Sequence, residues 1–237
     1  MYIKICGITK LDQAQAIAQM GADALGFICV PSSPRYVNTS TINHITSKLT
    51  NSDEHLGDRL DRLDVRQLDL IGVFLNASVL EICQTVKQGG LTAVQLHGDE
   101  SPDFCREARS LLDKINPDIK LIKALRVKNQ AGLEQAKLFS AVVDAILLDA
   151  YDPQMAGGTG KTIDWQMLRD FRPSCPWWLA GGLTPENVDK AIAQVCPDGL
   201  DVSSGVELAA GDKDLYKVEK FMAIAKPITK VGEKFIS

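Results

Sequence analysis

Two side chains that can exchange protons each stand at the end of a short apolar run. Cys6 ends residues 2–6, and Asp149 follows residues 145–148. A thiolate can take a proton from carbon, but a thiol with an ordinary pKa of ~8.5 is mostly protonated at neutral pH. We therefore expect the site to favour the thiolate, with backbone donors near Gly7 as helpers. Asp149 must be partly desolvated to hold a proton. Cys6 and Asp149 are thus a candidate base and acid, although either alone is weak evidence.

Two glycine- and serine-rich segments could bind an oxyanion. Gly181 and Gly182 let the backbone come close to a ligand because they carry no Cβ. Ser203, Ser204 and Gly205 offer hydroxyl and amide donors, which helix-terminal N–H groups would reinforce. The alternative is that both segments are turns that serve only the chain path. We favour a phosphate site because both segments follow apolar runs that fall late in the chain.

Other polar residues gather after further apolar runs. Arg35 lies in a proline-containing segment, and a guanidinium can hold a carboxylate or a phosphate through two parallel hydrogen bonds. Gln95, His97 and Asp201 are further candidates for substrate contact. The segment 157–161 fails the spacing of a nucleotide-binding P-loop and is better interpreted as a lid over the substrate, with a plain flexible loop as the alternative.

The elements that must position these residues alternate regularly between strand-like and helix-like patterns. The predicted strands cover 2–6, 24–30, 70–75, 93–96, 120–125, 145–150, 177–180 and 200–202, and the predicted helices 12–20, 41–49, 79–87, 102–112, 131–139, 165–171, 185–194 and 215–225. Such alternation predicts βαβ units and a parallel sheet. Eight units in 237 residues fit one α/β domain with the (β/α)8 TIM-barrel fold, 1–237. A doubly wound fold lacks support because no G-x-G-x-x-G follows the first strand.

In this fold the site is built at the carboxyl ends of the strands, and a phosphate commonly docks on the loops after strands seven and eight. The candidate residues fall at those positions. Two segments stand apart from the pattern. The charged insertion at 51–64 links a helix to a strand, so we expect it on the opposite face as a solvated loop or short helix. The second is a short tail after 226.

Composition excludes several classes of function. A net charge of −4 and a pI near 5.4 argue against a nucleic-acid partner, which needs a basic face. No apolar run approaches the ~20 residues that span a membrane. The six cysteines contain no C-x-x-C pair and the three histidines share no ligand spacing, so we expect no metal. We expect a cytoplasmic protein that is a monomer, since no long apolar stripe marks the helix faces.

The ordered motifs resemble those of a known family. Lys4–Thr9, Ser33–Val37, Gly72–Phe74, Gln95–Glu100, Gly157–Gly160, Leu179–Leu183 and Asp201–Glu207 look like phosphoribosylanthranilate isomerase of tryptophan biosynthesis. Any one of these segments is modest evidence, but their common order from residue 4 to about 225 is highly specific. The insertion and the tail depart from the family without touching a motif.

The resemblance implies an Amadori rearrangement of N-(5-phosphoribosyl)anthranilate to 1-(2-carboxyphenylamino)-1-deoxyribulose 5-phosphate. By analogy Asp149 is the general acid that opens the ribose ring, and Cys6 is the general base that removes the proton from C2. Arg35 would bind the anthranilate carboxylate and the two late loops the phosphate. No cofactor is implied, because the iminium intermediate is itself the electron sink.

Two rival functions differ in testable ways. The analogous isomerase of histidine biosynthesis resembles a repeated half-barrel with an aspartate at the first strand, whereas Cys6 stands here and no half repeat is visible. A non-catalytic barrel that binds phosphorylated metabolites would need neither Cys6 nor Asp149. Loss of turnover with retained phosphate-ligand binding would favour that second class.

Overall fold

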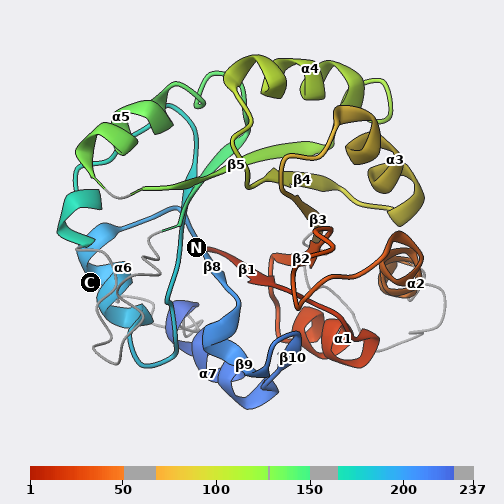
Figure 1. The fold of residues 1–237 in the computed structure, drawn as a ribbon. Helices are drawn as coiled ribbons and strands as arrows, with labels where there is room; N and C mark the ends of the chain where they lie inside the picture. The colour runs from red at the N-terminus through yellow and green to blue at the C-terminus, as the bar shows by residue number, and fades with distance from the viewer. Residues whose placement is uncertain (51–67, 128, 150–164, 227–237) are drawn as a thin grey trace, which may run out of the picture.

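The computed structural model describes residues 1–50, 68–127, 129–149 and 165–226. Eight parallel strands close into a barrel in the order β1 to β8, with helices around the outside (Figure 1). The predicted (β/α)8 barrel is therefore confirmed. The insertion at 51–64, the segment 157–161 and the tail after 226 lie outside the described residues, so the expectations placed on them stay predictions.

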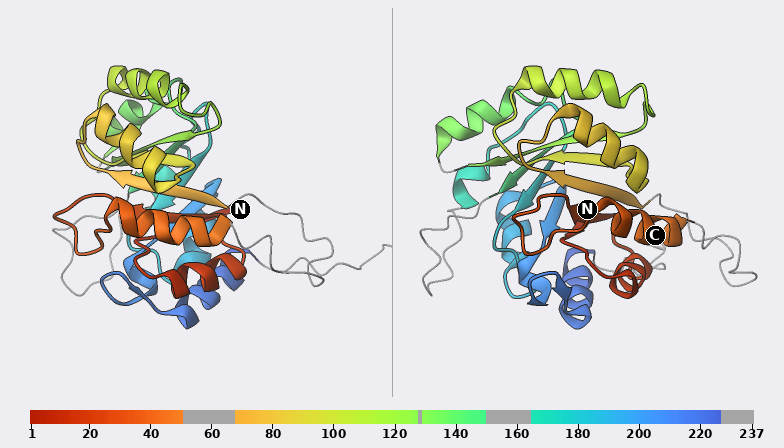
Figure 2. Two further views of the ribbon diagram at one scale, coloured as in Figure 1. Left: turned by 90° about the vertical axis from the view of Figure 1, so that its right-hand side faces the viewer. Right: turned by 45° about the vertical axis from the view of Figure 1, so that its right-hand side comes forward.

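The barrel strands are β1 (Tyr2–Cys6), β2 (Ala24–Ile28), β3 (Asp69–Phe74), β4 (Ala93–Leu96), β5 (Lys120–Arg126), β6 (Ala145–Asp149), β7 (Trp177–Ala180) and β8 (Gly199–Val202). The helices are α1 (Leu11–Gln19), α2 (Thr39–Thr50), α3 (Val79–Gly89), α4 (Pro102–Leu112), α5 (Gln130–Lys137), α6 (Val188–Val195) and α7 (Leu215–Ala225). Two views from the side show the helices packed along the outer surface of the strands (Figure 2).

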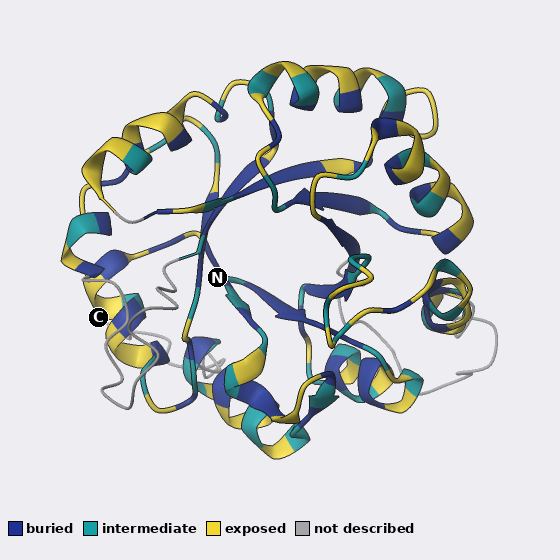
Figure 3. Cartoon of the chain, viewed as in Figure 1, coloured by how far each residue is buried: buried dark blue, intermediate teal, exposed yellow. Residues whose placement is uncertain are grey.

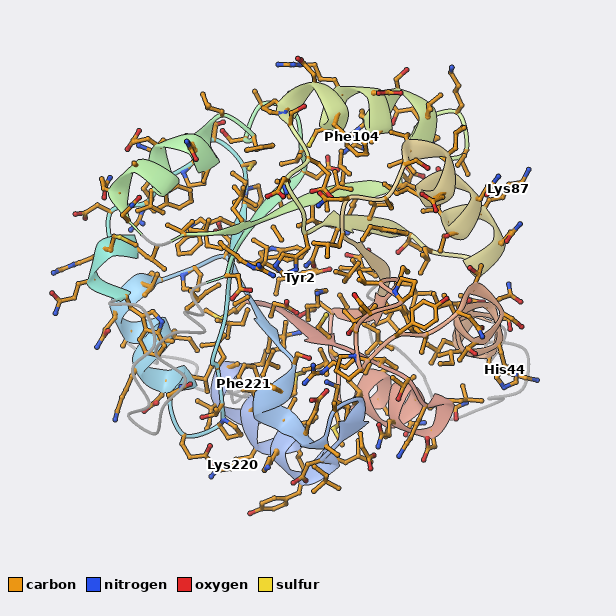
Figure 4. The ribbon with its side chains drawn as sticks, viewed as in Figure 1. Tyr2, His44, Lys87, Phe104, Lys220 and Phe221 are labelled. Carbon is orange, nitrogen blue, oxygen red and sulfur yellow. The ribbon has the colours of Figure 1, made fainter. Side chains whose placement is uncertain are left out.

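The strands are buried on both faces. Residues that face the helices form a large apolar core, coloured as buried in Figure 3, while the outer faces of the helices are exposed. Residues that face the barrel axis alternate with them along each strand. Tyr2 lies near the middle of the ring and stacks on Trp178, whereas the labelled Lys87 and Lys220 lie at its outer edge (Figure 4). The side chains on the inner face therefore fill the interior of the barrel, and polar side chains gather at its carboxyl end.

Side chains at the helix starts explain several boundaries. Ser78 and Glu81 form a capping box at the start of α3, and Ser101 caps α4. Helix α2 starts two residues before its predicted position, and Asn38 Oδ1 accepts a hydrogen bond from the Thr41 N–H in its first turn. These hydrogen bonds satisfy amides that have no partner within the helix.

Among the predicted elements whose bounds differ from the structure, three have a local explanation. The helix expected over 165–171 is a 3₁₀ helix, η3 (Trp165–Leu168), followed by i+3 turn bonds at Arg169 and Phe171. Helix α6 begins at Val188 rather than 185, because Asn187 folds the preceding turn by accepting from the Thr184 N–H. Strand β2 ends at Ile28 instead of 30, where the chain enters the turn closed by the Ser33 N–H on the Val30 carbonyl.

A small element after the barrel had no counterpart in the prediction. Beyond β8 the chain forms the 3₁₀ helix η4 (Ser204–Val206) and the antiparallel pair β9 (Glu207–Ala209) and β10 (Asp212–Lys213). Gly211, with a φ of +78°, lies in the turn between these two strands. This hairpin carries two charged residues, Glu207 and Lys213, back to the barrel mouth.

Within the described residues no helix combines the length and the apolar character that crossing a bilayer requires.

Candidate active site

A cavity of about 290 Å³ opens at the carboxyl end of the barrel. The residues predicted for catalysis and substrate binding all line it: Cys6, Arg35, Gln95, His97, Asp149, Gly181, Gly182, Asp201, Ser203, Ser204 and Gly205. Ile28, Val73, Ala180, Leu183 and Val202 add apolar wall, and Ser33 adds a hydroxyl. The structure therefore brings all the candidate residues to one place.

Strand alternation explains why these side chains meet. Cys6 ends β1 and Asp149 ends β6, and both point inward from strands separated by β7 and β8. On β8 the inward residue is Asp201, with Ser203 two residues further on. Cys6 and Asp149 thus face the cavity from different sides of its rim.

The Cys6 thiol is buried, and burial raises its pKa; attraction to the Lys4 ammonium opposes that rise without cancelling it. Burial therefore works against the expected thiolate, and among the neighbouring groups Lys4 favours the thiolate most strongly. The expected backbone donors are also engaged elsewhere, because the N–H groups of Gly7 and Ile8 both donate to the Gly26 carbonyl at 2.9 Å. A buried thiol without such donors favours its neutral form.

Three ion pairs lie beneath and beside the cavity, and two of them share Glu207. The Lys4 ammonium is fully buried and lies 3.0 Å from Asp201 Oδ1. Arg35 donates from Nε to Glu207 Oε1 at 2.9 Å and from Nη2 to Oε2 at 2.6 Å. Lys213 Nζ lies 2.7 Å from the same Glu207 and also donates to the Cys6 carbonyl. Burial disfavours the Glu207 carboxylate, but hydrogen bonds from Arg35 and Lys213 outweigh it and hold its pKa below the ordinary value.

Arg35 therefore has a protein partner and still lines the cavity. The hydrogen bonds to Glu207 raise the pKa of Arg35 and keep it a cation. Gly7 makes room for it: with a φ of +81°, a Cβ there would lie 2.7 Å from Arg35 Cδ and 3.1 Å from Ser203 Oγ. Glycine at this turn lets the arginine and the serine approach the Cys6 backbone.

The two glycine-rich loops pack directly against each other. Gly181 and Gly182 have φ values of +90° and +66°, which glycine adopts without strain. A Cβ on Gly205 would lie 1.9 Å from the Leu183 carbonyl oxygen, so only glycine fits there. Asn187 Nδ2 donates to the Gly182 carbonyl at 2.9 Å and fixes the first loop. The arrangement leaves backbone and serine hydroxyls together at one end of the cavity.

A polar chain leads to Asp149. Gln95 Nε2 lies 3.4 Å from His97 Nδ1, and His97 Nε2 lies 3.5 Å from Asp149 Oδ2. Gln95 is 1% exposed, and among the described residues its Oε1 has no hydrogen-bond partner. An unpartnered buried acceptor beside a cavity can receive a donor from a ligand.

Sequence reasoning did not assign roles to Lys4, Glu207 and Lys213, although Lys4 and Glu207 lie in the motifs it quoted. A signal was present for Lys4: a lysine in the middle of an apolar barrel strand must be buried, and a buried lysine needs a partner. Glu207 and Lys213 gave no such signal, because their contacts depend on the hairpin β9–β10.

In the part of the chain that the structure describes, no group of three or more histidine, cysteine, aspartate or glutamate side chains could hold a metal ion.

The fold and the cavity define a (β/α)8 barrel with a polar site at the carboxyl end of its strands, lined by Cys6, Asp149 and two glycine-rich loops. A sequence model of N-(5'phosphoribosyl)anthranilate (PRA) isomerase matches residues 3–223. The chain belongs to the N-(5'-phosphoribosyl)anthranilate isomerase family, which acts in tryptophan biosynthesis, and the predicted resemblance and reaction are thereby confirmed.

Relatives of that name are close in sequence and in structure. The isomerase of Trichormus variabilis is 53% identical over 218 residues, which cover 92% of this chain and 95% of the relative. That of Nostoc punctiforme is 52% identical, covering 93% and 96%. The crystal structure of the Thermotoga maritima isomerase superposes with a TM-score of 0.78 at 36% identity, covering 95% of this chain and 98% of that one.

Proposed function

We propose that Cys6 and Asp149 are the base and the acid of the Amadori rearrangement in this chain. The observation that carries the proposal is that both line one cavity with the paired glycine–serine loops. A substrate phosphate bound at those loops would hold the ribose between the two proton-transfer groups. A solved family member is a complex with reduced 1-(o-carboxyphenylamino)-1-deoxyribulose 5-phosphate, and it superposes with a TM-score of 0.73 at 34% identity.

The reaction requires two proton transfers in sequence. Asp149 donates a proton to the ring oxygen, the C1–O bond breaks, and nitrogen supplies the electrons to form an iminium. Cys6 as thiolate then removes the proton from C2, and the electrons flow to the iminium to give an enolamine. Tautomerisation of the enolamine yields the ketose, so atoms and electrons balance within the substrate. Each acid–base step contributes roughly 10²- to 10⁴-fold, and positioning supplies much of the rest.

The remaining polar residues bind the substrate in this proposal. Glu207 occupies the Nε–Nη2 edge of Arg35, so the Nη1–Nη2 edge is the one that can hold the anthranilate carboxylate. Gly181, Gly182, Ser203, Ser204 and Gly205 hold the phosphate. Gln95, whose Oε1 has no hydrogen-bond partner among the described residues, accepts from a substrate hydroxyl or amine. We also place His97 and Asp201 at the substrate, and we propose a monomer that acts in the cytoplasm.

Turnover of freshly prepared phosphoribosylanthranilate, followed by the loss of its fluorescence, tests the proposal. We expect Cys6→Ser and Asp149→Asn each to lower kcat by roughly 10²- to 10⁴-fold while product-analogue binding is kept. Turnover that Cys6→Ser leaves untouched would keep the reaction but move the base elsewhere. A folded wild type that binds the analogue without turning over would return the chain to the binding-barrel alternative.

A further inference from the structure

A buried ammonium group lies inside the barrel next to Cys6. Lys4 precedes Cys6 by two residues on β1, so both side chains face the barrel axis. Lys4 is opposite Asp201 in the register of β1 and β8, and its Nζ lies 3.0 Å from Asp201 Oδ1. The side chain of Lys4 has no exposed surface, and that of Asp201 is 10% exposed. The lysine is thus held by one carboxylate at a fixed depth below the cavity.

Gly26 brings the lysine and the thiol together. It is the residue of β2 opposite Cys6. A Cβ on Gly26 would lie 2.7 Å from Cys6 Sγ and 3.0 Å from Lys4 Cε. The sulfur and the end of the lysine chain therefore fill the same space over this glycine. No step of the proposed reaction uses Lys4.

We propose that Lys4 is a positioning residue whose ammonium, anchored by Asp201 and seated over Gly26, stabilises the Cys6 thiolate. The inference rests on the proposed function, in which Cys6 is the base. Burial raises the pKa of Cys6, and Lys4 is the group that opposes this rise most strongly. Burial also disfavours charge on Lys4, but attraction to Asp201 and to Cys6 outweighs it and raises the pKa of Lys4. Lys4 is therefore a cation at neutral pH.

Other charged or titratable groups surround Cys6. They are Asp201 on β8, Lys213 on β10, Arg35 and Cys29 after β2, His97 after β4 and Asp149 on β6. Asp201 works against the thiolate, but less strongly than Lys4 supports it. Lys213 and Arg35 are both bound to Glu207, and Lys213 is directed at the Cys6 carbonyl. Lys4 is thus the cation best placed to act on the sulfur.

The test measures Cys6 ionisation without relying on turnover. Alkylation of Cys6 by iodoacetamide is followed against pH by peptide mass mapping, in the wild type and in Lys4→Gln. Glutamine keeps a donor for Asp201 while removing the charge. We expect the midpoint, the pH at which the Cys6 alkylation rate is half its maximum, to rise by one unit or more in Lys4→Gln. At a pH below both midpoints, Cys6 in the variant should then be alkylated about tenfold more slowly for each unit of that rise. Lys120→Gln removes another barrel lysine, half-exposed and paired with Asp69 at 2.6 Å, and should leave the Cys6 midpoint unchanged.

Kinetics supply the second readout. In Lys4→Gln we expect kcat to fall at least tenfold at neutral pH and to recover as pH rises, with little change in KM. A merely structural role would lower kcat equally at every pH. Superimposable Cys6 alkylation profiles in a folded Lys4→Gln would overturn the inference. If Cys6→Ser keeps its turnover, the proposed base is wrong, yet the alkylation profile still decides whether Lys4 stabilises the thiolate.

A further variant covers the case in which Lys4→Gln fails to fold by circular dichroism. Gly26→Ala retains both side chains and inserts a methyl group between them and β2. We expect it to raise the Cys6 alkylation midpoint, because the sulfur and the ammonium cannot both keep their positions. An unchanged midpoint in Gly26→Ala would then overturn the inference.

Discussion

The Arg35 guanidinium is held by Glu207 along one edge, with Nε 2.9 Å from Oε1 and Nη2 2.6 Å from Oε2. Glu207 is buried and also binds Lys213, so its carboxylate is held in place. This carboxylate fixes the orientation of the Arg35 guanidinium before any substrate binds. An arginine oriented in this way can present its other edge to a carboxylate with little loss of side-chain entropy.

Arg35→Met should weaken recognition of the anthranilate carboxylate. Charged hydrogen bonds contribute about 1.5–3 kcal/mol, so we expect kcat/KM to fall roughly 10- to 150-fold. Steady-state kinetics with a substrate that lacks the carboxylate provide the control. The wild type should lose activity on that substrate, while Arg35→Met should handle both substrates equally. A variant that still discriminates between them would show that another residue binds the carboxylate.

Gly205→Ala should separate the two glycine-rich loops for which we propose phosphate binding. Its Cβ would meet the Leu183 carbonyl oxygen at 1.9 Å, and backbone cannot yield as a side chain can. We expect a stability loss of about 1–3 kcal/mol and loss of inorganic phosphate binding, measured by urea unfolding and calorimetry.

Gly21→Ala is the matched control for that variant. Gly21 has a φ of +85°, but among the described residues no atom lies within 4 Å of the position that a Cβ would take. Only backbone strain of about 1–2 kcal/mol should therefore result. Phosphate binding should be unchanged in Gly21→Ala. Equal phosphate affinity in both variants would contradict the proposed role of the Gly205 loop.

Removing one partner of the buried pair Lys123–Glu100 should strongly destabilise the barrel. Both side chains are at most 2% exposed, and Glu100 also accepts from the N–H groups of Asn76 and Gly98. Lys123→Met leaves that carboxylate buried without a cationic partner. We expect the free energy of unfolding to fall by about 3–5 kcal/mol.

An exposed pair supplies the comparison. Lys137 and Glu134 lie 2.9 Å apart on the surface of α5, and Lys137→Met should change stability by no more than about 0.5 kcal/mol. Chemical denaturation of both variants tests the contrast. A small effect of Lys123→Met would indicate that water reaches Glu100.

Two thiols with raised pKa values should make the protein less stable at alkaline pH. Burial raises the pKa of Cys29 to about 12 and that of Cys105 to about 11. Because the folded pKa values are raised, the thiols stabilise the fold fully below the unfolded pKa of about 8.5. This stabilisation is lost as pH rises toward the folded values, with a slope of about 1.4 kcal/mol per pH unit for each thiol.

Unfolding free energies between pH 8 and 10 measure that slope. Cys29→Ala and Cys105→Ala should each flatten the decline, even though each lowers stability at pH 7. Cys196→Ala alters an exposed thiol and should leave the slope unchanged. A decline of equal steepness in all three variants would mean that other groups cause the alkaline loss.

The sequence by itself determined the barrel fold and which residues line the cavity at its carboxyl end. Strand and helix periodicities alternate clearly, and a parallel barrel places the carboxyl ends of all its strands at one mouth. Cys6, Asp149 and the paired loops could therefore be assigned to one cavity from the order of the strands alone. The period of two residues along each strand also directs Cys6 and Asp201 toward the axis.

Only the tertiary structure decided how those residues are charged and held. The pairing of Lys4 with Asp201 depends on the register between the first and last strands, which no local pattern specifies. The binding of Arg35 to Glu207 depends on the hairpin β9–β10 folding back over the mouth. The raised pKa of Cys6 depends on burial and on neighbours distant in sequence. Electrostatics act through space, so the fold must exist before the ionisation of its site is defined.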